Sequence, residues 1–401
     1  MAVIVRAQSS SASTVQPDGH FAASQAVAGI SEARSSGLDA EGAKSLGSYG
    51  PIRRNISRFA AGDTGIGFAV FSTARNSGEK VMTQLQIDGI VPIIPSPFLS
   101  DGSPDWNSLK NLLDFAVGAG VSAVCLPAYA SEFYKLTDVE RREAAIRAVD
   151  LLHGRLPVIG QVNHVSTEYV VETARELERC GVSAISVAVP RLFNLPERDL
   201  LRYFDRILSA IGIPLLIQDF NPGGTTVSLD FVQQLHRQHA HFRYLKLEEA
   251  LMSERVRAIA DGTNGEIGVL EGWGGMYMIE LIKVGIVGVM PSLGVADVLQ
   301  LVWNRARQGD HDGAYGAFVG VLPQILYSLQ TLEFYHHAEK ALLVARSVLP
   351  APIVRDATLT VGSDDRMHIE FLNRKVLEWI DHLGMAKCRT EDSTQAAGQT
   401  L

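Results

Sequence analysis

The sequence predicts a (β/α)8 TIM barrel with a C-terminal helical extension, an α/β fold class that three observations favour. Eight short apolar runs recur about every 25–30 residues from residue 89 onward, with longer amphipathic stretches between them. The runs are nearly continuous in Val, Ile and Leu, which is typical of parallel strands buried on both faces. A doubly wound open sheet is the main alternative, but eight strands favour the closed barrel. No Gly-x-Gly-x-x-Gly sequence follows the first run.

The predicted strands, in chain order, are Gly89–Ile94, Val121–Leu126, Pro157–Val162, Val182–Val189, Pro214–Gln218, Arg243–Leu247, Ile267–Glu271 and Ile286–Met290. The stretches between them carry apolar residues at helical spacing. Two helix starts are visible in the sequence. Thr137 followed by Glu140 predicts a capping box, and Ser166 predicts a second N-cap.

The chain also has segments outside the predicted barrel of residues 82–310. Residues 1–81 are rich in Ser, Ala and Gly and lack hydrophobic periodicity, which predicts a disordered N-terminal extension. A transit peptide is an alternative, but such peptides are poor in acidic residues and this segment contains several. In a third interpretation the native protein starts at Met82, and the extension is non-native. Residues 311–383 predict a C-terminal helical extension, and residues 384–401 predict a flexible tail.

Composition excludes several classes of protein. The 401-residue chain is 46% hydrophobic and 20% charged, which suits a soluble α/β enzyme. Its net charge of −8 argues against nucleic acid or an anionic membrane as a partner. No apolar run approaches the roughly 18 residues that span a bilayer. The cysteines Cys125, Cys180 and Cys388 are far apart, which indicates neither a disulfide framework nor a zinc site and fits the cytoplasm.

Lys246 is the most informative residue of the chain, because it lies inside an apolar strand. Burial disfavours the charged ammonium form of a lysine. Desolvation of this kind produces a nucleophilic amine at neutral pH, and such an amine forms a Schiff base with a carbonyl substrate. The alternative is a strand-end lysine whose stem packs while its ammonium reaches water.

Polar side chains follow the predicted strands at the end of the barrel where active sites are built. Besides Lys246 they are Tyr129, Ser131, Asn163, His164, Arg191, Gln218, Asp219, Glu271 and Ser292. We interpret His164 as a helix-cap or loop residue. Glu271 is either a general base or an ion-pair partner of Lys246 or Arg191. The pair His336–His337 is not expected to bind metal, and no other His, Asp or Glu triplet has metal-ligand spacing.

Several ordered motifs resemble the dihydrodipicolinate synthase / N-acetylneuraminate lyase family of class I aldolases. The matching segments are Gly89–Phe98 with Asp101–Gly102, Ser131–Thr137, Tyr244–Glu248, Val269–Gly272 and Gly285–Met290. The resemblance covers about Asp88 to Leu349. It implies that Lys246 forms the Schiff base, that no metal or organic cofactor is needed, and that the protein is a homo-oligomer, a dimer or a tetramer.

Departures from the family pattern narrow this resemblance. Ala128–Ser131 replaces the usual Gly-Thr-Thr-Gly, and Gln218 replaces the tyrosine that serves as acid/base. The arginine that synthases use for their aldehyde substrate is missing near Gly224. These losses argue against dihydrodipicolinate synthase itself. The segments around Gln218 and Glu271 look more like the L-2-keto-3-deoxyarabonate dehydratase-like members, which dehydrate sugar-derived 2-oxo acids.

We therefore predict a Schiff-base-forming lyase whose partner is a small 2-oxo acid, most simply a dehydratase of a 2-keto-3-deoxy sugar acid. The predicted catalytic residues are Lys246, Gln218 and Tyr129. The predicted substrate-binding residues are Ala130, Ser131, Glu271, Gly272 and Met290. Two alternatives stay open: a pyruvate-dependent aldolase or synthase of the same family, and a non-catalytic barrel that binds 2-oxo acids.

Overall fold

The computed structural model describes residues 85–221, 226–249 and 252–385, and within them eight parallel strands form one sheet in the order β1-β8-β7-β6-β5-β4-β3-β2. The strands are β1 Gly89–Ile90, β2 Val124–Leu126, β3 Val158–Gln161, β4 Ala184–Ala188, β5 Leu215–Asp219, β6 Phe242–Leu247, β7 Gly268–Glu271 and β8 Gly288–Val289. All eight predicted strands are confirmed. The predicted N-terminal extension, and residues 386–401 of the predicted tail, lie outside the described residues.

The sheet closes into a barrel through hydrogen bonds between the segments of β1 and β2. The amide of Ser122 donates to the carbonyl of Ile90 at 2.8 Å, and the amide of Ile94 donates to Cys125 at 3.0 Å. The β1 ladder is shorter than the predicted run, because Pro92 has no N–H to donate to a neighbouring strand. The predicted closed (β/α)8 barrel is confirmed, and the open sheet is not formed.

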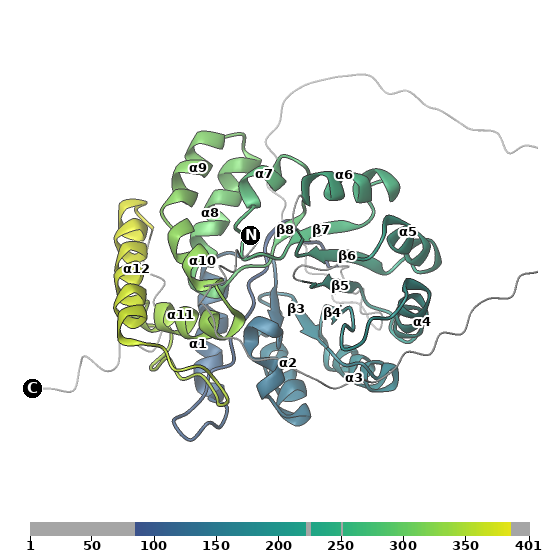
Figure 1. Ribbon diagram of the computed structural model, residues 1–401, viewed down its shortest axis with the longest axis horizontal. Helices are drawn as coiled ribbons and strands as arrows, with labels where there is room; N and C mark the ends of the chain where they lie inside the picture. Colours follow the sequence, from purple (N-terminus) through teal and green to yellow (C-terminus); the bar gives the residue numbers. More distant parts are fainter. Residues whose placement is uncertain (1–84, 222–225, 250–251, 386–401) are drawn as a thin grey trace, which may run out of the picture. The chain divides into compact units, whose positions relative to one another are not determined.

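Helices alternate with the strands and surround them (Figure 1). They are α1 Trp106–Gly118, α2 Asp138–Leu152, α3 Thr167–Cys180, α4 Glu197–Leu208, α5 Leu229–Gln238, α6 Met252–Gly262, α7 Met278–Ile282 and α8 Ala296–Arg307. Both predicted helix starts are confirmed. Thr137 and Glu140 form a capping box at α2, and the Ser166 side chain accepts a hydrogen bond from the third residue of α3.

The barrel has two apolar layers, which alternate along each strand with a period of two residues. On β6, Leu245 and Leu247 pack outward against the helices. Tyr244 faces the interior, where its hydroxyl donates to the carbonyl of Leu85 at 2.7 Å. Lys246 is the next inward position after Tyr244, so the same alternation carries its side chain toward the C-terminal mouth of the barrel.

Four further helices follow the barrel: α9 His311–Val319, α10 Leu322–Ser328, α11 Leu332–Ala345 and α12 Ser363–His382. Two buried ion pairs fix this region to the barrel: Lys340 of α11 pairs with Glu132, and Arg346, directly after α11, pairs with Asp297. The predicted C-terminal helical extension is therefore confirmed. None of the helices in the described ranges combines the length and the apolar character required to cross a bilayer.

Candidate active site

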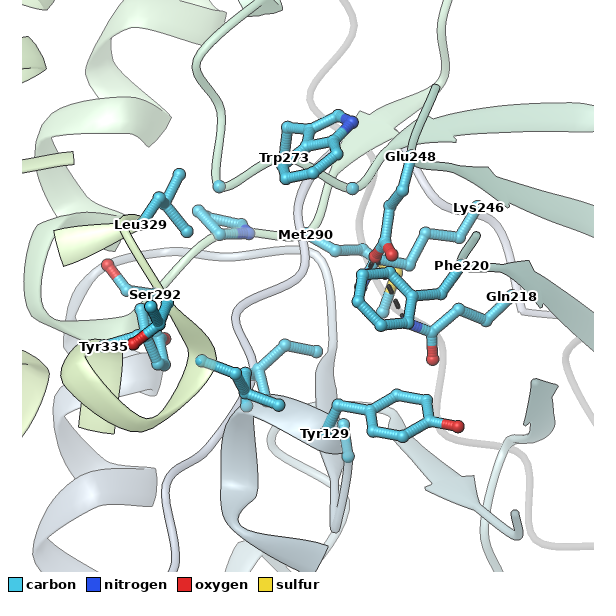
Figure 2. A pocket seen from close by; sticks show the side chains of 18 of the residues that line it. Tyr129, Gln218, Phe220, Lys246, Glu248, Trp273, Met290, Ser292, Leu329 and Tyr335 are labelled. Carbon is cyan, nitrogen blue, oxygen red and sulfur yellow. Dashed lines mark hydrogen bonds and ion pairs between the residues drawn. The ribbon is translucent and has the colours of Figure 1, made fainter. Parts of the chain in front are cut away.

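A cavity of about 300 Å³ opens at the C-terminal ends of the strands. This is the end of a (β/α)8 barrel at which active sites are built. Of the eight predicted site residues, six line the cavity. They are Tyr129, Ala130, Gln218, Lys246, Gly272 and Met290. Figure 2 shows Lys246 and Gln218 on one side of this cavity, with Met290 between them and the opposite wall.

Lys246 forms a buried ion pair with a carboxylate from the same strand segment. Its Nζ lies 2.7 Å from Oε1 of Glu248, and the two side chains are only 7% and 5% exposed. Residues two apart on a strand project to the same face. The sequence Lys-Leu-Glu at the end of β6 therefore directs an amine and a carboxylate into one cavity.

A line of hydrogen-bonded amides extends from this pair across the barrel interior. Gln218 donates from Nε2 to Glu248 Oε1 at 3.1 Å, and its own Oε1 accepts from Gln161 Nε2 at 2.6 Å. Cys125 contacts the other end of the Gln161 amide, with Sγ 3.6 Å from Oε1. These bonds fix the orientation of the Gln218 amide, so that its nitrogen rather than its oxygen faces Glu248.

Glu248 carries a second oxygen without a partner. Its Oε2 is buried and accepts no hydrogen bond within the described part of the chain. Burial raises the pKa of the Glu248 carboxyl, an effect that the ammonium of Lys246 opposes. A buried carboxyl with a raised pKa and an unused oxygen has the properties of an acid/base residue.

The sequence-based site prediction missed Glu248, although a signal was present. In an alternating strand, the residue two positions after an inward lysine also points inward. Applied to Lys246, this rule indicates Glu248 directly. Glu271, the predicted ion-pair partner of Lys246 or Arg191, pairs with neither of them. Lys246 pairs with Glu248, and Arg191 pairs with Asp219.

Gly272 lies where the backbone after β7 passes close to the ion pair. A Cβ atom at this position would lie 2.7 Å from Lys246 Cε and 2.7 Å from Glu248 Oε1. Such separations are shorter than van der Waals contact, so a larger residue here displaces both side chains. Because glycine has no side chain, Gly272 provides room for the side chains of Lys246 and Glu248.

The turn after β2 borders the cavity and contains two backbone amides without a hydrogen-bond acceptor among the described residues. Tyr129–Ser131 forms a short 3-10 helix, and the N–H groups of Tyr129 and Ala130 find no acceptor among the described residues. The first N–H groups of a helix lack internal partners and suit an anion. The Tyr129 ring packs edge-on against Phe133 with the ring centroids 4.8 Å apart, and burial raises the pKa of its phenol.

Two predicted substrate-binding residues do not line the cavity but support its wall from behind. Ser131 is fully buried; its Oγ donates to the carbonyl of Ile94 at 2.6 Å and accepts from the amide of Ala128 at 2.9 Å. Glu271 is also fully buried, and its oxygens accept from the amides of Trp273 and Gly275. Their polar atoms are thus engaged in shaping the two loops that border the cavity.

The remaining polar candidates have structural partners. His164 accepts at Nδ1 from the amide of Ser166, which fits the loop role predicted for it. His336 is buried in α11 beside the hydroxyl of Tyr134, 3.0 Å away, and burial lowers its pKa to about 3. In the described ranges no group of three or more His, Cys, Asp or Glu side chains is arranged to hold a metal ion.

Comparisons with known proteins place this geometry in context. A family model described as the Dihydrodipicolinate synthetase family matches residues 86–332. An L-2-keto-3-deoxyarabonate dehydratase from Azospirillum brasilense is 28% identical over 241 residues, which cover 59% of this chain and 78% of the relative. A 4-hydroxy-tetrahydrodipicolinate synthase from Methanococcus maripaludis strain C7 is 27% identical over 233 residues, covering 57% and 78%.

The fold is also found in solved structures. The crystal structure of a dihydrodipicolinate synthase from Rhodopseudomonas palustris superposes with a TM-score of 0.68 at 23% sequence identity. The superposition covers 73% of this chain and 99% of that chain. At this identity the likeness concerns the fold.

Proposed function

Because this chain belongs to the Dihydrodipicolinate synthetase family, we propose that it is a Schiff-base-forming lyase that dehydrates a 2-keto-3-deoxy acid at C4. The observation that carries this proposal is the Lys246–Glu248 pair, with Nζ 2.7 Å from Oε1 inside the cavity. The pair combines a nucleophile with an adjacent base, which is the arrangement that covalent catalysis requires. The likeness to a named dehydratase supports water loss as the reaction.

The first step joins Lys246 to the substrate. Glu248 takes a proton from the Lys246 ammonium, and the free amine attacks the C2 carbonyl. Glu248 then gives this proton to the carbinolamine hydroxyl, which leaves as water, so that an iminium forms and Glu248 is a carboxylate again. During this step the substrate carboxylate binds the backbone N–H groups of Tyr129 and Ala130, whose amides lack acceptors in the described structure.

The second step removes the C4 hydroxyl. The iminium withdraws electrons from C3, so Glu248 takes a C3 proton through its unpaired Oε2 and an enamine forms. The same carboxyl then protonates the C4 hydroxyl, which leaves as water while the enamine electrons form the C3–C4 double bond. Hydrolysis of the unsaturated iminium releases the product and regenerates Lys246. One proton goes from C3 to the leaving oxygen, so the step is balanced.

The other predicted site residues act on this centre indirectly. Gln218 orients Glu248 through its 3.1 Å hydrogen bond, and an amide in this place cannot exchange a proton as a phenol does. Tyr129 lines the carboxylate-binding turn, and Met290 lines the wall beside Lys246. We assign Ser131 and Glu271 to holding the two loops in place, since their oxygens bond to backbone amides.

Cleavage of the C3–C4 bond is the second candidate reaction, since an aldolase passes through the same iminium and relatives in this family include a synthase. The two reactions are separated by their products. With a 2-keto-3-deoxy-pentonate as substrate, dehydration retains all carbon atoms in one molecule, whereas aldol cleavage releases pyruvate and an aldehyde. Mass spectrometry of the product mixture decides between them. Pyruvate released in step with substrate consumption would overturn the dehydratase assignment.

We further propose that the enzyme works in the cytoplasm as a homo-oligomer. Family membership and the widely spaced cysteines support this. The loop after β4 supports it too, because Leu192 and Phe193 there are 68% and 71% exposed. Exposed large apolar side chains of this kind mark contact surfaces. Analytical ultracentrifugation of the full chain tests the association, and a purely monomeric protein at working concentrations would contradict it.

A further inference from the structure

We propose that the substrate of this enzyme carries an apolar alkyl or aryl group on C4, so that the substrate class is 4-hydroxy-2-oxo acids with an apolar tail. This inference rests on the proposed function, which fixes the carboxylate, C2, C3 and C4 near Lys246. It concerns the part of the cavity beyond C4. Figure 2 shows Leu329, Ser292 and Tyr335 on the side of the cavity opposite Lys246, with Trp273 between them and Glu248.

The wall beyond C4 is built mainly from carbon. Its large side chains are Leu329, Leu332 and Tyr335, with Trp273 next to them, while Phe220 and Met290 add apolar surface nearer to Lys246. These apolar side chains come from the loops after β5, β7 and β8, from the residue after α10, and from the first turn of α11. Within the described residues, no arginine and no second lysine lines this cavity. Contact with such a wall favours a tail that gives up little hydration on binding.

The polar side chains at this end already make hydrogen bonds inside the protein. Ser292 bonds to the buried carboxyl of Glu339. Thr331 accepts at Oγ1 from an amide at the start of α11, at 3.1 Å, and Gln330 donates from Nε2 to the carbonyl of Tyr327 at 3.0 Å. A polyhydroxylated tail needs several partners to replace its water, and these residues have part of their capacity in use.

The reaction itself does not require polar groups in this region. Water loss moves a proton from C3 to the C4 oxygen, and Glu248 serves both positions. The product of an apolar substrate is a 2-oxo-3-enoic acid, in which the new C3–C4 double bond is conjugated with the ketone. With an aryl tail the conjugation extends to the ring, so formation of the product is followed by its ultraviolet absorbance.

The test compares two kinds of substrate on the full-length protein. One kind has an apolar tail: 4-hydroxy-4-phenyl-2-oxobutanoate and 4-hydroxy-6-methyl-2-oxoheptanoate. The other has a hydroxylated tail: 2-keto-3-deoxy-pentonate and 2-keto-3-deoxy-hexonate. We expect kcat/KM to be at least about tenfold higher for the apolar kind, since even one methylene changes discrimination by such factors. Equal or higher kcat/KM for the hydroxylated kind would overturn the inference.

A trapping assay with pyruvate distinguishes an error in the inference about the tail from an error in the proposed function. Pyruvate has no tail, so a borohydride-reduced adduct depends on Lys246 and not on the apolar wall. An adduct together with a preference for hydroxylated substrates overturns only the inference about the tail. Absence of an adduct overturns the proposed function and this inference with it.

A matched pair of variants tests the wall directly. Leu329 lines the cavity, whereas Leu326, one turn earlier, is 47% exposed and lies outside it. We expect Leu329→Asn to lower kcat/KM for the phenyl substrate about tenfold while the yield of the pyruvate adduct stays within twofold of wild type. Leu326→Asn should leave both unchanged. If Leu329→Asn leaves the preference between the two kinds of substrate unaltered, the wall does not select the tail.

Discussion

Lys246 and Glu248 face the same cavity from one strand end, with the ammonium nitrogen 2.7 Å from a carboxylate oxygen. The geometry follows from the strand itself, because side chains two residues apart share a face. Both side chains are buried, so the carboxylate acts on the amine in a medium where electrostatic interactions are strong. This relationship is the centre of the proposed chemistry, and the predictions below concern the pair and the residues that hold it.

Glu248→Gln should slow the chemical step without removing the nucleophile. The variant keeps the shape of the side chain but loses the base, so we expect kcat to fall roughly 10²–10⁴-fold. The Lys246 adduct with pyruvate should still form, but more slowly, because Glu248 also takes the proton from the Lys246 ammonium. Because burial raises the pKa of Glu248, the acid limb of the wild-type kcat/KM profile should lie above pH 4.5 and disappear in the variant.

Glu249→Gln is the matched control for this variant, because Glu249 follows Glu248 but bonds to Thr226 and Arg255 instead of lining the cavity. Its kcat should stay within about threefold of the wild-type value. Equal losses in both variants would show that Glu248 has no special part in the reaction.

Gly272→Ala should abolish Schiff-base formation while the protein stays folded. The added methyl group would lie 2.7 Å from Lys246 Cε and displace it from the substrate carbonyl. Intact mass after borohydride reduction with pyruvate measures the adduct. Gly316→Ala in α9 is the control, since its added Cβ would meet no atom within 4 Å apart from its chain neighbours and the backbone of its own helix, and alanine there favours the helix by roughly 1 kcal/mol. A normal adduct yield in Gly272→Ala would contradict the proposed space requirement.

Ser131→Ala should weaken substrate binding more than it slows the reaction. The change leaves the buried amide of Ala128 and the carbonyl of Ile94 without their partner, at about 1–3 kcal/mol each. The carboxylate-binding turn then loses its support, so we expect KM to rise about tenfold with kcat little changed. Steady-state kinetics measures both constants.

Ser108→Ala provides the comparison for Ser131→Ala. Ser108 is a buried serine at the start of α1 that does not line the cavity, and its Oγ donates to Asp105. The Ser108→Ala variant should have a lower thermal stability than the wild type and an unchanged KM. The role assigned to Ser131 would be refuted by an unchanged KM in Ser131→Ala.

Glu271 should make the stability of the fold depend on pH. Burial raises its pKa to about 7 from an ordinary value of 4.5, so the folded state binds this proton more tightly than the unfolded chain does. The stabilisation is fully present below pH 4.5 and is lost as the pH rises through 7. Relative to Glu271→Gln, the wild-type free energy of unfolding should fall by roughly 3 kcal/mol over this window.

Urea unfolding at several pH values measures this difference. Glu370→Gln, on an exposed face of α12, should show no such pH dependence. A Glu271→Gln difference that stays constant from pH 4.5 to 8 would contradict the buried titration.

Much of the fold was predictable because it depends on local patterns. The eight apolar runs and the capping box at Thr137 are local signals, and each appears in the structure as predicted. Lys246 stood out because a charge inside an apolar strand is rare. Pro92 shows the limit of the strand prediction: the run around it is apolar, but a proline cannot complete the ladder.

The walls of the site depend on contacts between distant segments, which periodicity does not reveal. Leu329 and Tyr335 come from the C-terminal extension, yet they line the same cavity as Trp273. Ser131 and Glu271 sit at strand ends, as expected of site residues, but their oxygens are consumed by nearby amides. A strand-end position indicates proximity to the site, whereas the hydrogen-bond partners decide whether a side chain is available to a ligand.

The central claim is that Lys246 forms the covalent bond to a 2-oxo acid, and borohydride trapping with pyruvate tests it most directly. The wild type should gain a reduced adduct on the peptide that contains Lys246, as should Lys283→Met, which alters an exposed lysine after α7. Lys246→Met should gain none while remaining folded. Absence of any adduct in the folded wild type, or an adduct that persists in Lys246→Met, would contradict the account, and the former would favour a barrel that binds 2-oxo acids without catalysis.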